Sequence, residues 1–455
     1  MPPQLALVLC TAFVLFLLHL DRKQALTVSR ALWIPSIWML VVASRPVTRW
    51  FEPEGPRADA GGQLDQLFLI VVLLLGMFIL TQRKVRWSNA LKEYSWFMLL
   101  IGYMLVSIFW SDIPFSSFKR WIRELIAIVM ALVVLTEPEP RQALESVFRR
   151  VTYILIPFSV LLIKYYAAEY GVRFSPWSGK RMWIGVTTQK NALGRLCMIA
   201  AFFLIWTLMR RWKGRDMRLA KYQTLAEVSV LMMTLWLLKG PEGDYSATAT
   251  VALSGALATL CVLQWLKRHE MNVGANTLTA ITAILIGFGT VTPMYGGSVV
   301  TYFASDLGRD ATLTGRTEIW ADLLPVAMRQ PITGYGFGGF WTAATRAAHD
   351  INEAHSGYLG LLLELGFIGL FLVAMFLLSC SRKAQRTLAH DYDWGSLWMG
   401  FLLMALIHNV TETSITSFTS YPSAVLLFLA FSSTAPSSCA MKISRKVIHL
   451  SNTIH

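Results

Sequence analysis

Residues 355–379 read HSGYLGLLLELGFIGLFLVAMFLLS, a polar start followed by a long apolar run in which Glu364 is the only charged side chain. As a helix, the run Tyr358–Ser379 is long enough to cross the hydrocarbon core of a bilayer, which needs about 20 apolar residues. It predicts a transmembrane helix that begins beside His355. The preceding segment, from Thr312 onward, belongs to the longest part of the chain without an apolar run.

Apolar runs of this kind recur along the whole chain. Hydrophobic residues make up 55% of the 455 residues, charged residues 15%, and the mean hydropathy is +0.50. Soluble domains carry more charge, about 25%. Helices are favoured because each satisfies its own backbone hydrogen bonds in lipid. We expect an all-α polytopic bundle of about 12–13 spans forming a single integral membrane domain, residues 1–455. The candidate spans are Leu5–Leu20, Ala25–Ala43, Gln66–Thr81, Trp96–Trp110, Trp121–Leu135, Val151–Tyr166, Ala192–Met209, Leu225–Leu238, Thr248–Leu266, Leu278–Val291, Tyr358–Ser379, Trp394–Val410 and Ser423–Phe431.

The orientation follows from the basic loops. Lys and Arg crowd the segments 83–92, 210–221 and 382–386, which fall on the same side when the spans alternate. The positive-inside rule makes that side cytoplasmic. The same rule accounts for most of the net charge of +14, so nucleic acid is not an expected partner. The large loop 293–355 then lies outside.

Several basic residues oppose this rule because they fall on the predicted outer face. An anionic ligand such as a pyrophosphate is one reason for them, since Arg and Lys bind phosphate oxygens well. Long side chains that reach lipid phosphates are the alternative. The candidates for a pyrophosphate contact among them are Arg120, Arg123, Lys180, Arg181 and Lys190.

His355 is placed at the outer membrane surface, where a neutral imidazole is suited to accept a proton. At about 100° per residue, Gly366 and Gly369 return to roughly its face of the helix. We expect them to form a smooth stripe against which a neighbouring helix packs. Glu364 points to about the opposite side and is expected to contact another helix or a polar cavity.

Two further motifs lie in the outer loop. If Gly315 precedes a helix, Arg316 hangs into the loop near His355, or else it forms a surface ion pair with Glu318 or Asp322. The glycines of 334–339 match a dinucleotide-binding pattern formally, but no strand precedes them, so we expect a tight loop. No metal-binding or cofactor motif is present, and the five scattered cysteines predict neither a disulfide nor a zinc site.

Taken together, these motifs resemble the O-antigen ligase superfamily, which includes lipopolysaccharide O-antigen ligases, Wzy-type polymerases and ExoQ-like exopolysaccharide proteins. The resemblance runs from about residue 180 to 412 and is favoured toward the ExoQ-like branch by the segment 306–320. One departure is Ser246-Ala247, where the family often has a basic residue after the serine. The residues that carry the resemblance are Thr314, Gly315, Arg316, Trp320, the 334–339 loop, His355, Ser356, Gly366, Gly369, the 185–191 segment, Asn409 and Glu412.

The resemblance implies a GT-C-like architecture and an inverting, metal-independent glycosyl transfer at the periplasmic face of a bacterial inner membrane. The donor would be a saccharide on undecaprenyl pyrophosphate, and the acceptor a sugar hydroxyl on a glycan or a lipid core. His355 would be the general base, Arg316 and the outer basic residues would hold the pyrophosphate, and Asn191 and Tyr358 would contact sugar. A chain-length regulator or a flippase would be a partner protein.

Two other functions remain open at this point. A flippase or transporter of lipid-linked sugar would show the same basic outer face, although no internal repeat is evident. A sensor or structural membrane protein would give no reason for a histidine placed over glycines.

Overall fold

The computed structural model describes residues 1–25, 27–52, 62–83, 94–175, 179–213, 218–241, 245–271, 273–274, 276–295 and 315–432. These residues form helices almost throughout, as the apolar composition predicts. The first half contains α1 (Pro3–Gln24), η1 (Arg30–Leu32), α2 (Trp33–Val42), α3 (Thr48–Phe51), α4 (Gln63–Thr81), α6 (Ser95–Ser107), η2 (Ile108–Trp110), α7 (Pro114–Leu135), α8 (Pro140–Tyr165) and η3 (Ala167–Gly171). The second half contains α9 (Lys190–Lys213), α10 (Arg218–Lys239), α11 (Ala247–Arg268), α12 (Thr277–Met294), α14 (Arg316–Ala327), α15 (Ala343–His349), α16 (Gly357–His390), α17 (Tyr392–Thr411) and α18 (Tyr421–Ser432).

The helices coincide with the apolar runs, and the chain is an all-α polytopic membrane protein. By length and composition, seven described helices are suited to cross a membrane, namely α1, α4, α8, α9, α11, α12 and α16. Three shorter apolar helical segments lie at Arg30–Val42, Ser95–Trp110 and Tyr421–Ser432. The total of 12–13 crossings therefore stays a prediction.

A short hairpin is the one described piece of sheet. β1 (Val172–Phe174) pairs antiparallel with β2 (Arg181–Trp183), with Arg173 opposite Met182. The sequence does not predict this hairpin, because each strand has three residues and a recognisable alternating pattern needs at least about four. The hairpin joins α8 to α9 on the predicted outer side.

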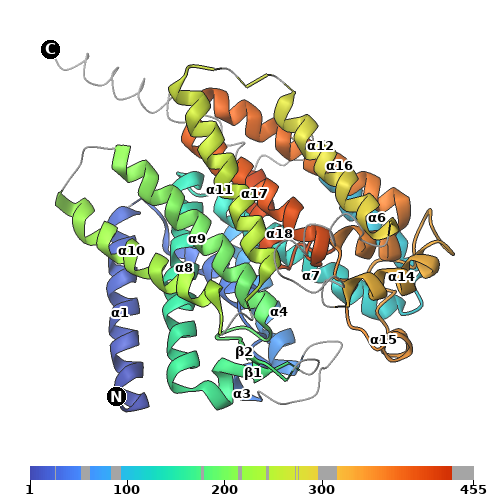
Figure 1. Ribbon diagram of the computed structural model, residues 1–455, viewed down its shortest axis with the longest axis horizontal. Coiled ribbons are helices and arrows are strands. Elements are labelled where there is room, and N and C mark those ends of the chain that lie inside the picture. Colours follow the sequence, from blue (N-terminus) through green and yellow to red (C-terminus); the bar gives the residue numbers. More distant parts are fainter. Residues whose placement is uncertain are drawn as a thin grey trace.

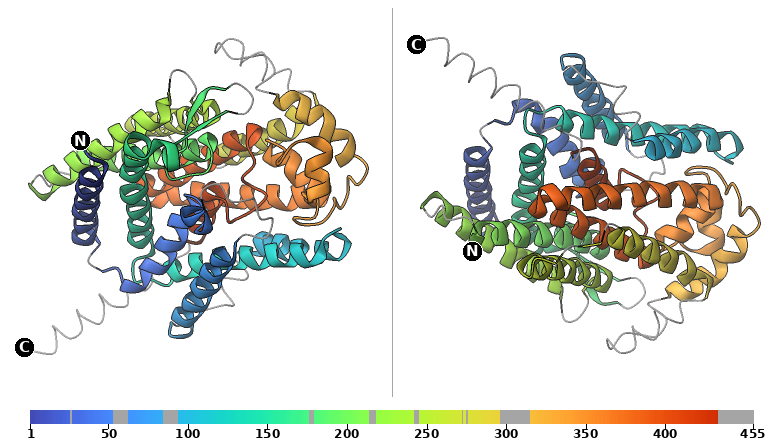
Figure 2. Two further views of the ribbon diagram at one scale, coloured as in Figure 1. Left: turned by 90° about the horizontal axis from the view of Figure 1, so that it is seen from below. Right: turned by 90° about the horizontal axis from the view of Figure 1, so that it is seen from above.

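Burial separates central helices from peripheral ones. In the apolar window of α8, 83% of residues are buried, against 17% in α1 and in α4. Figure 1 shows α1 at one edge of the molecule and α14 with α15 at the opposite edge, and Figure 2 shows the same separation from below and above. The exposed apolar faces of α1 and α4 suit contact with lipid tails, while α8, α9, α17 and α18 form the centre.

The ion pairs divide the described loops into two sets, and each ion pair joins two segments of the same set. In the set predicted to be cytoplasmic, Arg83 pairs with Glu137 at 2.5 Å and Arg210 pairs with Glu145 at 2.6 Å. In the same set, Arg141 pairs with Asp391 at 2.7 Å. The loops predicted to be external meet one another through the contacts described for the site below. This segregation is what alternating crossings require.

A break in α16 corrects the expected glycine stripe. Gly366 has φ +63° and ψ −164°, a conformation that is essentially restricted to glycine. A Cβ there would lie 2.3 Å from the carbonyl oxygen of Ile332. The expected stripe is wrong because the helix is interrupted at Gly366, and the Cβ of Gly369 would meet Leu365 of its own helix instead of a neighbour.

The glycine-rich loop fills this break. The amide N–H of Tyr335 donates to the carbonyl of Leu363 at 2.9 Å, and the N–H of Phe367 donates to the carbonyl of Pro331 at 2.8 Å. Gly334, Gly336 and Gly338 all have positive φ, which explains the glycine content of the loop. The expected tight loop is confirmed, and Glu364 contacts it by accepting the N–H of Gly338 at 3.0 Å. Of the predicted outer loop 293–355, residues 296–314 lie outside the described residues.

Candidate active site

Glu412, the residue directly after α17, lies at the centre of a cluster drawn from distant parts of the chain. Its Oε1 forms an ion pair with Arg316 at the start of α14. The same oxygen accepts a hydrogen bond from Nδ2 of Asn191 near the start of α9, at 2.7 Å. The Glu412 side chain is 1% exposed and that of Arg316 is 15% exposed. The carboxylate therefore ties three segments together below the protein surface.

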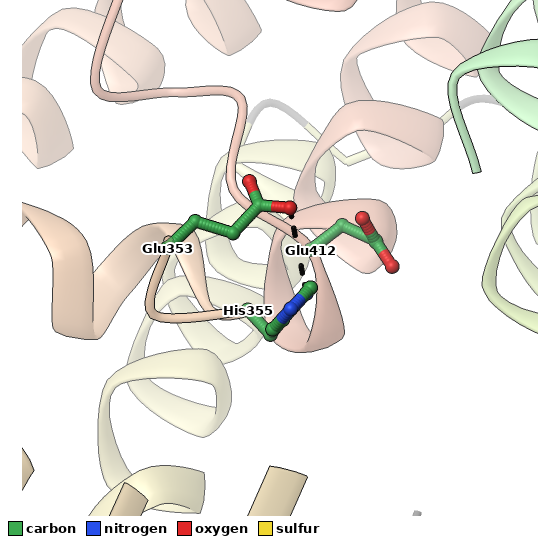
Figure 3. Close-up of side chains that lie close together, drawn as sticks. All are labelled: Glu353, His355 and Glu412. Carbon is green, nitrogen blue, oxygen red and sulfur yellow. Dashed lines mark ion pairs between the residues drawn. The ribbon is translucent and has the colours of Figure 1, made fainter. Parts of the chain in front are cut away.

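His355 lies beside this carboxylate. Its Nδ1 is 3.6 Å from Oε1 of Glu353, and the two side chains are 29% and 28% exposed. One ligand atom each of Glu353, His355 and Glu412 lies within 4.8 Å of the others. Figure 3 shows the imidazole ring of His355 beneath the carboxylate of Glu353, with Glu412 alongside. The imidazole is thus accessible from outside while its inner side meets buried charge.

Several polar atoms of this cluster have no partner among the described residues. They are buried, and include hydrogen-bond donors as well as acceptors. Buried polar groups in proteins are nearly always satisfied, so a group left unpaired at a site indicates a bound ligand or water. These atoms are Nε of Arg316, Oε2 of Glu412 and Oγ1 of Thr413.

The charge of Glu412 follows from its surroundings. Burial would raise the pKa of this carboxyl, but the charges of Arg316, His408, His355 and Arg195 outweigh burial and hold the pKa below its usual value. Glu412 is therefore ionised at neutral pH. An anion at this position orients the guanidinium of Arg316.

Local structure explains how each side chain is placed. Gly315 has φ +82° and precedes α14, so Arg316 is the first helical residue, as expected. Nε1 of Trp320 donates to the carbonyl of Ala354 at 3.0 Å, which fixes α14 to the residue before His355. His355 itself has φ +46°, and the hydroxyl of Ser356 caps α16 by accepting the N–H of Leu359 at 3.4 Å.

Asn409 shapes the turn that follows Glu412. Its Oδ1 accepts the N–H groups of Ser414 and Ile415, both at 2.9 Å. A Cβ on Gly357 would lie 2.3 Å from this oxygen, so the start of α16 packs directly on the turn. The late element noted in the sequence, Asn409 with Glu412, is thus built into the site.

Arg45 positions the segment that leads to Asn191. It is 3% exposed, and Nη2 donates to the carbonyls of Tyr170 at 3.0 Å and Thr187 at 2.9 Å. Burial, and next the charge of Arg173, lowers the pKa of Arg45 to about 10, so it stays protonated at neutral pH. Sequence reasoning missed this residue because its acceptors are carbonyls more than a hundred positions away.

The other predicted residues are spread around the predicted outer face. Arg120 donates to the carbonyl of Gly338 in the glycine-rich loop, so it is bound to the scaffold. Arg123, on the same helix, lies near Arg120 and Glu124. Lys180 and Arg181 are exposed on the hairpin, and Lys190 directly precedes Asn191. Of these five cations, Lys190 is adjacent in sequence to a residue of the cluster.

Tyr358 points into the protein. Its side chain is buried, and the hydroxyl donates to the carbonyl of Leu406 at 3.3 Å. A Cβ on Gly289 of α12 would collide with its ring. Tyr358 therefore joins α16 to α12 and α17, and we do not include it among the proposed substrate contacts.

Glu353 was not singled out by the sequence, although it lies two residues before His355. Two carboxylates and an imidazole are a donor set that can bind a divalent metal ion. Here Oε1 of Glu412 is already engaged by Arg316 and Asn191, and the guanidinium would repel a second cation. The donor set therefore fits a metal poorly, and the expectation of metal-independent chemistry stays a prediction.

Comparisons with known proteins agree with the motifs. The O-antigen ligase family model matches residues 243–374, the segment that holds Arg316 and His355. The exopolysaccharide production protein ExoQ of Rhizobium meliloti (strain 1021) is 23% identical over 341 residues, which are 70% of this chain and 72% of that protein. The chain is therefore similar to O-antigen ligases over residues 243–374 and to ExoQ over most of its length.

Proposed function

We propose that this protein is a periplasmic-face glycosyltransferase of the polymerase or ligase type. It transfers a saccharide from undecaprenyl pyrophosphate to a sugar hydroxyl, with inversion and without a metal ion. The observation that carries the proposal is the convergence of Arg316, Asn191 and Glu412 beside His355, with unsatisfied donors and acceptors in the same place. The similarity to O-antigen ligases and to ExoQ supports a role in polysaccharide synthesis.

His355 acts as the general base. Its ring accepts the proton of the acceptor hydroxyl as the oxygen bonds to the anomeric carbon of the donor. Since Nδ1 faces Glu353, Nε2 is the nitrogen directed to the substrate. The imidazolium that forms is stabilised by the carboxylates of Glu353 and Glu412. The proton therefore ends on His355, and the new glycosidic bond forms on the face opposite the leaving group.

Arg316 stabilises the leaving group. The bond from the anomeric carbon to the pyrophosphate oxygen breaks, and its electron pair stays on the lipid pyrophosphate. A guanidinium carries five N–H donors, so Arg316 can hold Glu412 through one nitrogen and still present Nε to a phosphate oxygen. Lys190 would add positive charge at the edge of the cluster. Asn191 keeps Glu412 in place and would contact the sugar through the same amide.

The test is glycan extension by purified protein in liposomes that contain a lipid-linked saccharide. We expect His355→Ala and Arg316→Ala to lower the transfer rate by about a hundredfold or more. His269→Ala, at the other end of α11, is the matched control and should transfer like the parent protein. Transfer at the parent rate by folded His355→Ala would refute the proposal. If no protein in the series transfers sugar, the parent included, but lipid-linked sugar still moves across the bilayer, the protein is instead a flippase.

The same assay separates polymerase from ligase and tests for a metal. A polymerase extends a second lipid-linked saccharide, whereas a ligase needs a lipid core as acceptor. Transfer activity should persist in EDTA. The Glu353→Gln variant should also transfer sugar, at a reduced rate. If EDTA abolishes transfer and a divalent ion restores it, Glu353, His355 and Glu412 form a metal centre and the proposed mechanism is wrong.

A further inference from the structure

Arg195 is a charged residue near the start of the apolar helix α9, which is long enough to cross a membrane. It is the one charged residue between positions 191 and 209. Its neighbours Gly194 and Leu196 are buried, whereas Arg195 is partly exposed. An ionisable side chain inside a span is costly in lipid, so it usually faces a polar cavity or a partner within the bundle. Arg195 therefore calls for an anionic or polar neighbour.

The side chain of Arg195 reaches the candidate active site. Asn191 and Arg195 are four positions apart in α9, so they share one face of the helix. Asn191 donates to Oε1 of Glu412 at 2.7 Å, and Nη1 of Arg195 donates to the carbonyl of Thr413, the next residue, at 3.4 Å. Burial would raise the pKa of Glu412, and the charge of Arg195 is among those that lower it instead. The guanidinium thus lies at the cluster.

Most of this guanidinium is left for a ligand. A guanidinium has five N–H donors, and among the described residues that of Arg195 makes one long hydrogen bond and no ion pair. Arg316 differs, because Glu412 already engages its Nη2. Oγ1 of Thr413, the residue that Arg195 contacts, is buried without a partner. A donor-rich cation beside a residue with an unpaired hydroxyl suits the oxygens of a bound anion.

The charges of the cluster indicate why a second guanidinium is needed. The carboxylates of Glu353 and Glu412 stand against one guanidinium, that of Arg316, and His355 has to be neutral in order to accept a proton. Without Arg195 this set has an excess of negative charge. A pyrophosphate joined to a lipid and a sugar carries about two negative charges at neutral pH, so the set would repel it. Arg195 cancels the excess.

We propose that Arg195 binds the pyrophosphate of the lipid-linked donor, as a second guanidinium beside Arg316. This role rests on the proposed glycosyl transfer and adds a residue that the sequence motifs do not identify. Arg195 donates to phosphate oxygens and takes no part in proton transfer. The phosphates of bilayer lipids share this chemistry, and the experiments below distinguish the two sources.

The first experiment measures the KM of the lipid-linked donor and that of the acceptor in proteoliposomes. We expect Arg195→Gln to raise the donor KM about tenfold or more, because charge-assisted contacts are lost, with the acceptor KM within about twofold. Arg195→Lys keeps the charge and should recover much of the loss. Arg329→Gln is the matched control and should keep the parent donor KM, because Arg329 is an exposed arginine in the predicted outer loop.

A binding measurement separates this role from the transfer reaction. Undecaprenyl pyrophosphate, and undecaprenol as the same lipid without pyrophosphate, are titrated into His355→Ala protein in liposomes that contain phosphatidylglycerol. Adding Arg195→Gln should weaken binding of the pyrophosphate about tenfold and leave binding of undecaprenol unchanged. No transfer is needed, so the result stands even if His355 is not the general base. A contact of Arg195 with bilayer phosphates alone would leave both affinities unchanged.

An equal donor KM and equal pyrophosphate binding with and without Arg195→Gln would overturn the proposal. A Lys variant no better than the Gln variant would also contradict it, because the charge would then have no part. If Arg195→Gln does not fold, the parent protein decides. Undecaprenyl pyrophosphate should protect Arg195 from phenylglyoxal, as read by mass spectrometry, and undecaprenol should not. Equal modification with and without the pyrophosphate would refute the role.

Discussion

Nδ2 of Asn191 lies 2.7 Å from Oε1 of Glu412, although 221 positions separate the two residues in the chain. The contact joins the first turn of α9 to the end of α17. Arg316 reaches the same oxygen from 96 positions away. The candidate site is therefore a product of the packing of the bundle, and its parts carry no shared local signature.

Replacing Glu412 by Gln tests the centre of the cluster. The amide keeps the shape but leaves Arg316 without its anion and removes the charge beside His355. We expect the transfer rate to fall at least about tenfold, equivalent to ~1.4 kcal/mol. The measurement is the liposome transfer rate at neutral pH. A rate equal to that of the parent would show that the charge of Glu412 has no part in the reaction.

The same variant has a pH signature in stability. The pKa of Glu412 is lowered on folding, so its ionised form adds stability above the unfolded pKa of about 4.3. That contribution is lost as the pH falls through the folded pKa. Thermal unfolding should therefore show a constant gap between parent and Gln variant from pH 8 to about pH 5, narrowing at lower pH. A gap that widens in acid would contradict the assigned charge.

Asp21 anchors the otherwise exposed helix α1. It is 1% exposed, and its carboxylate meets Arg149 at 2.8 Å and Arg150 at 3.0 Å. Asp21→Asn would leave Arg150 without its anion and Arg149 with Glu145 alone, at 3.4 Å, and removing one partner of a buried ion pair costs about 3–5 kcal/mol. We expect a clear drop of the unfolding temperature in detergent.

Asp391→Asn is the control for this prediction. Asp391 pairs with Arg141 at 2.7 Å, but the side chain of Asp391 is 41% exposed and that of Arg141 is 40% exposed. An exposed pair is worth about 1 kcal/mol or less. Equal unfolding temperatures of the two variants would show that the buried ion pairs of Asp21 do not hold α1.

The break in α16 predicts a sensitive glycine. Gly366→Ala would force an unfavourable backbone conformation, at about 1–3 kcal/mol, and bring a methyl group to 2.3 Å from the carbonyl oxygen of Ile332. We expect lower thermal stability and less transfer, since the glycine-rich loop would shift. Gly102→Ala, in α6, meets nothing within 4 Å and should melt at or above the parent temperature. Equal stability of the two variants would argue against the break.

The side of the membrane can be tested with a membrane-impermeant maleimide on intact spheroplasts. In a background with all five cysteines replaced by Ser, Met328→Cys on the proposed periplasmic side should be labelled. Trp212→Cys on the other side should be labelled only after lysis. Met328 and Trp212 are 40% and 93% exposed, so both are reachable. The reverse pattern would place His355 on the cytosolic side.

The helices could be predicted because they depend on local patterns, and His355 was placed at the start of one of the apolar runs. Gly315 and Arg316 were singled out by the resemblance to the O-antigen ligase motifs. Glu353, Arg45 and the hairpin could not be predicted from the sequence. The partners of the two residues come from other segments, and the strands of the hairpin are too short to show a pattern. Gly366 was read as a packing surface, since helical rotation assumes an unbroken helix.

The proposed role of the His355 imidazole can be tested most directly. The decisive measurement is the single-turnover rate of glycosyl transfer by folded His355→Ala protein, with and without added imidazole. We expect a loss of about 10²–10⁴-fold, as for removal of a general base, and partial recovery with imidazole. Transfer by the variant at the parent rate, with or without imidazole, would contradict the account.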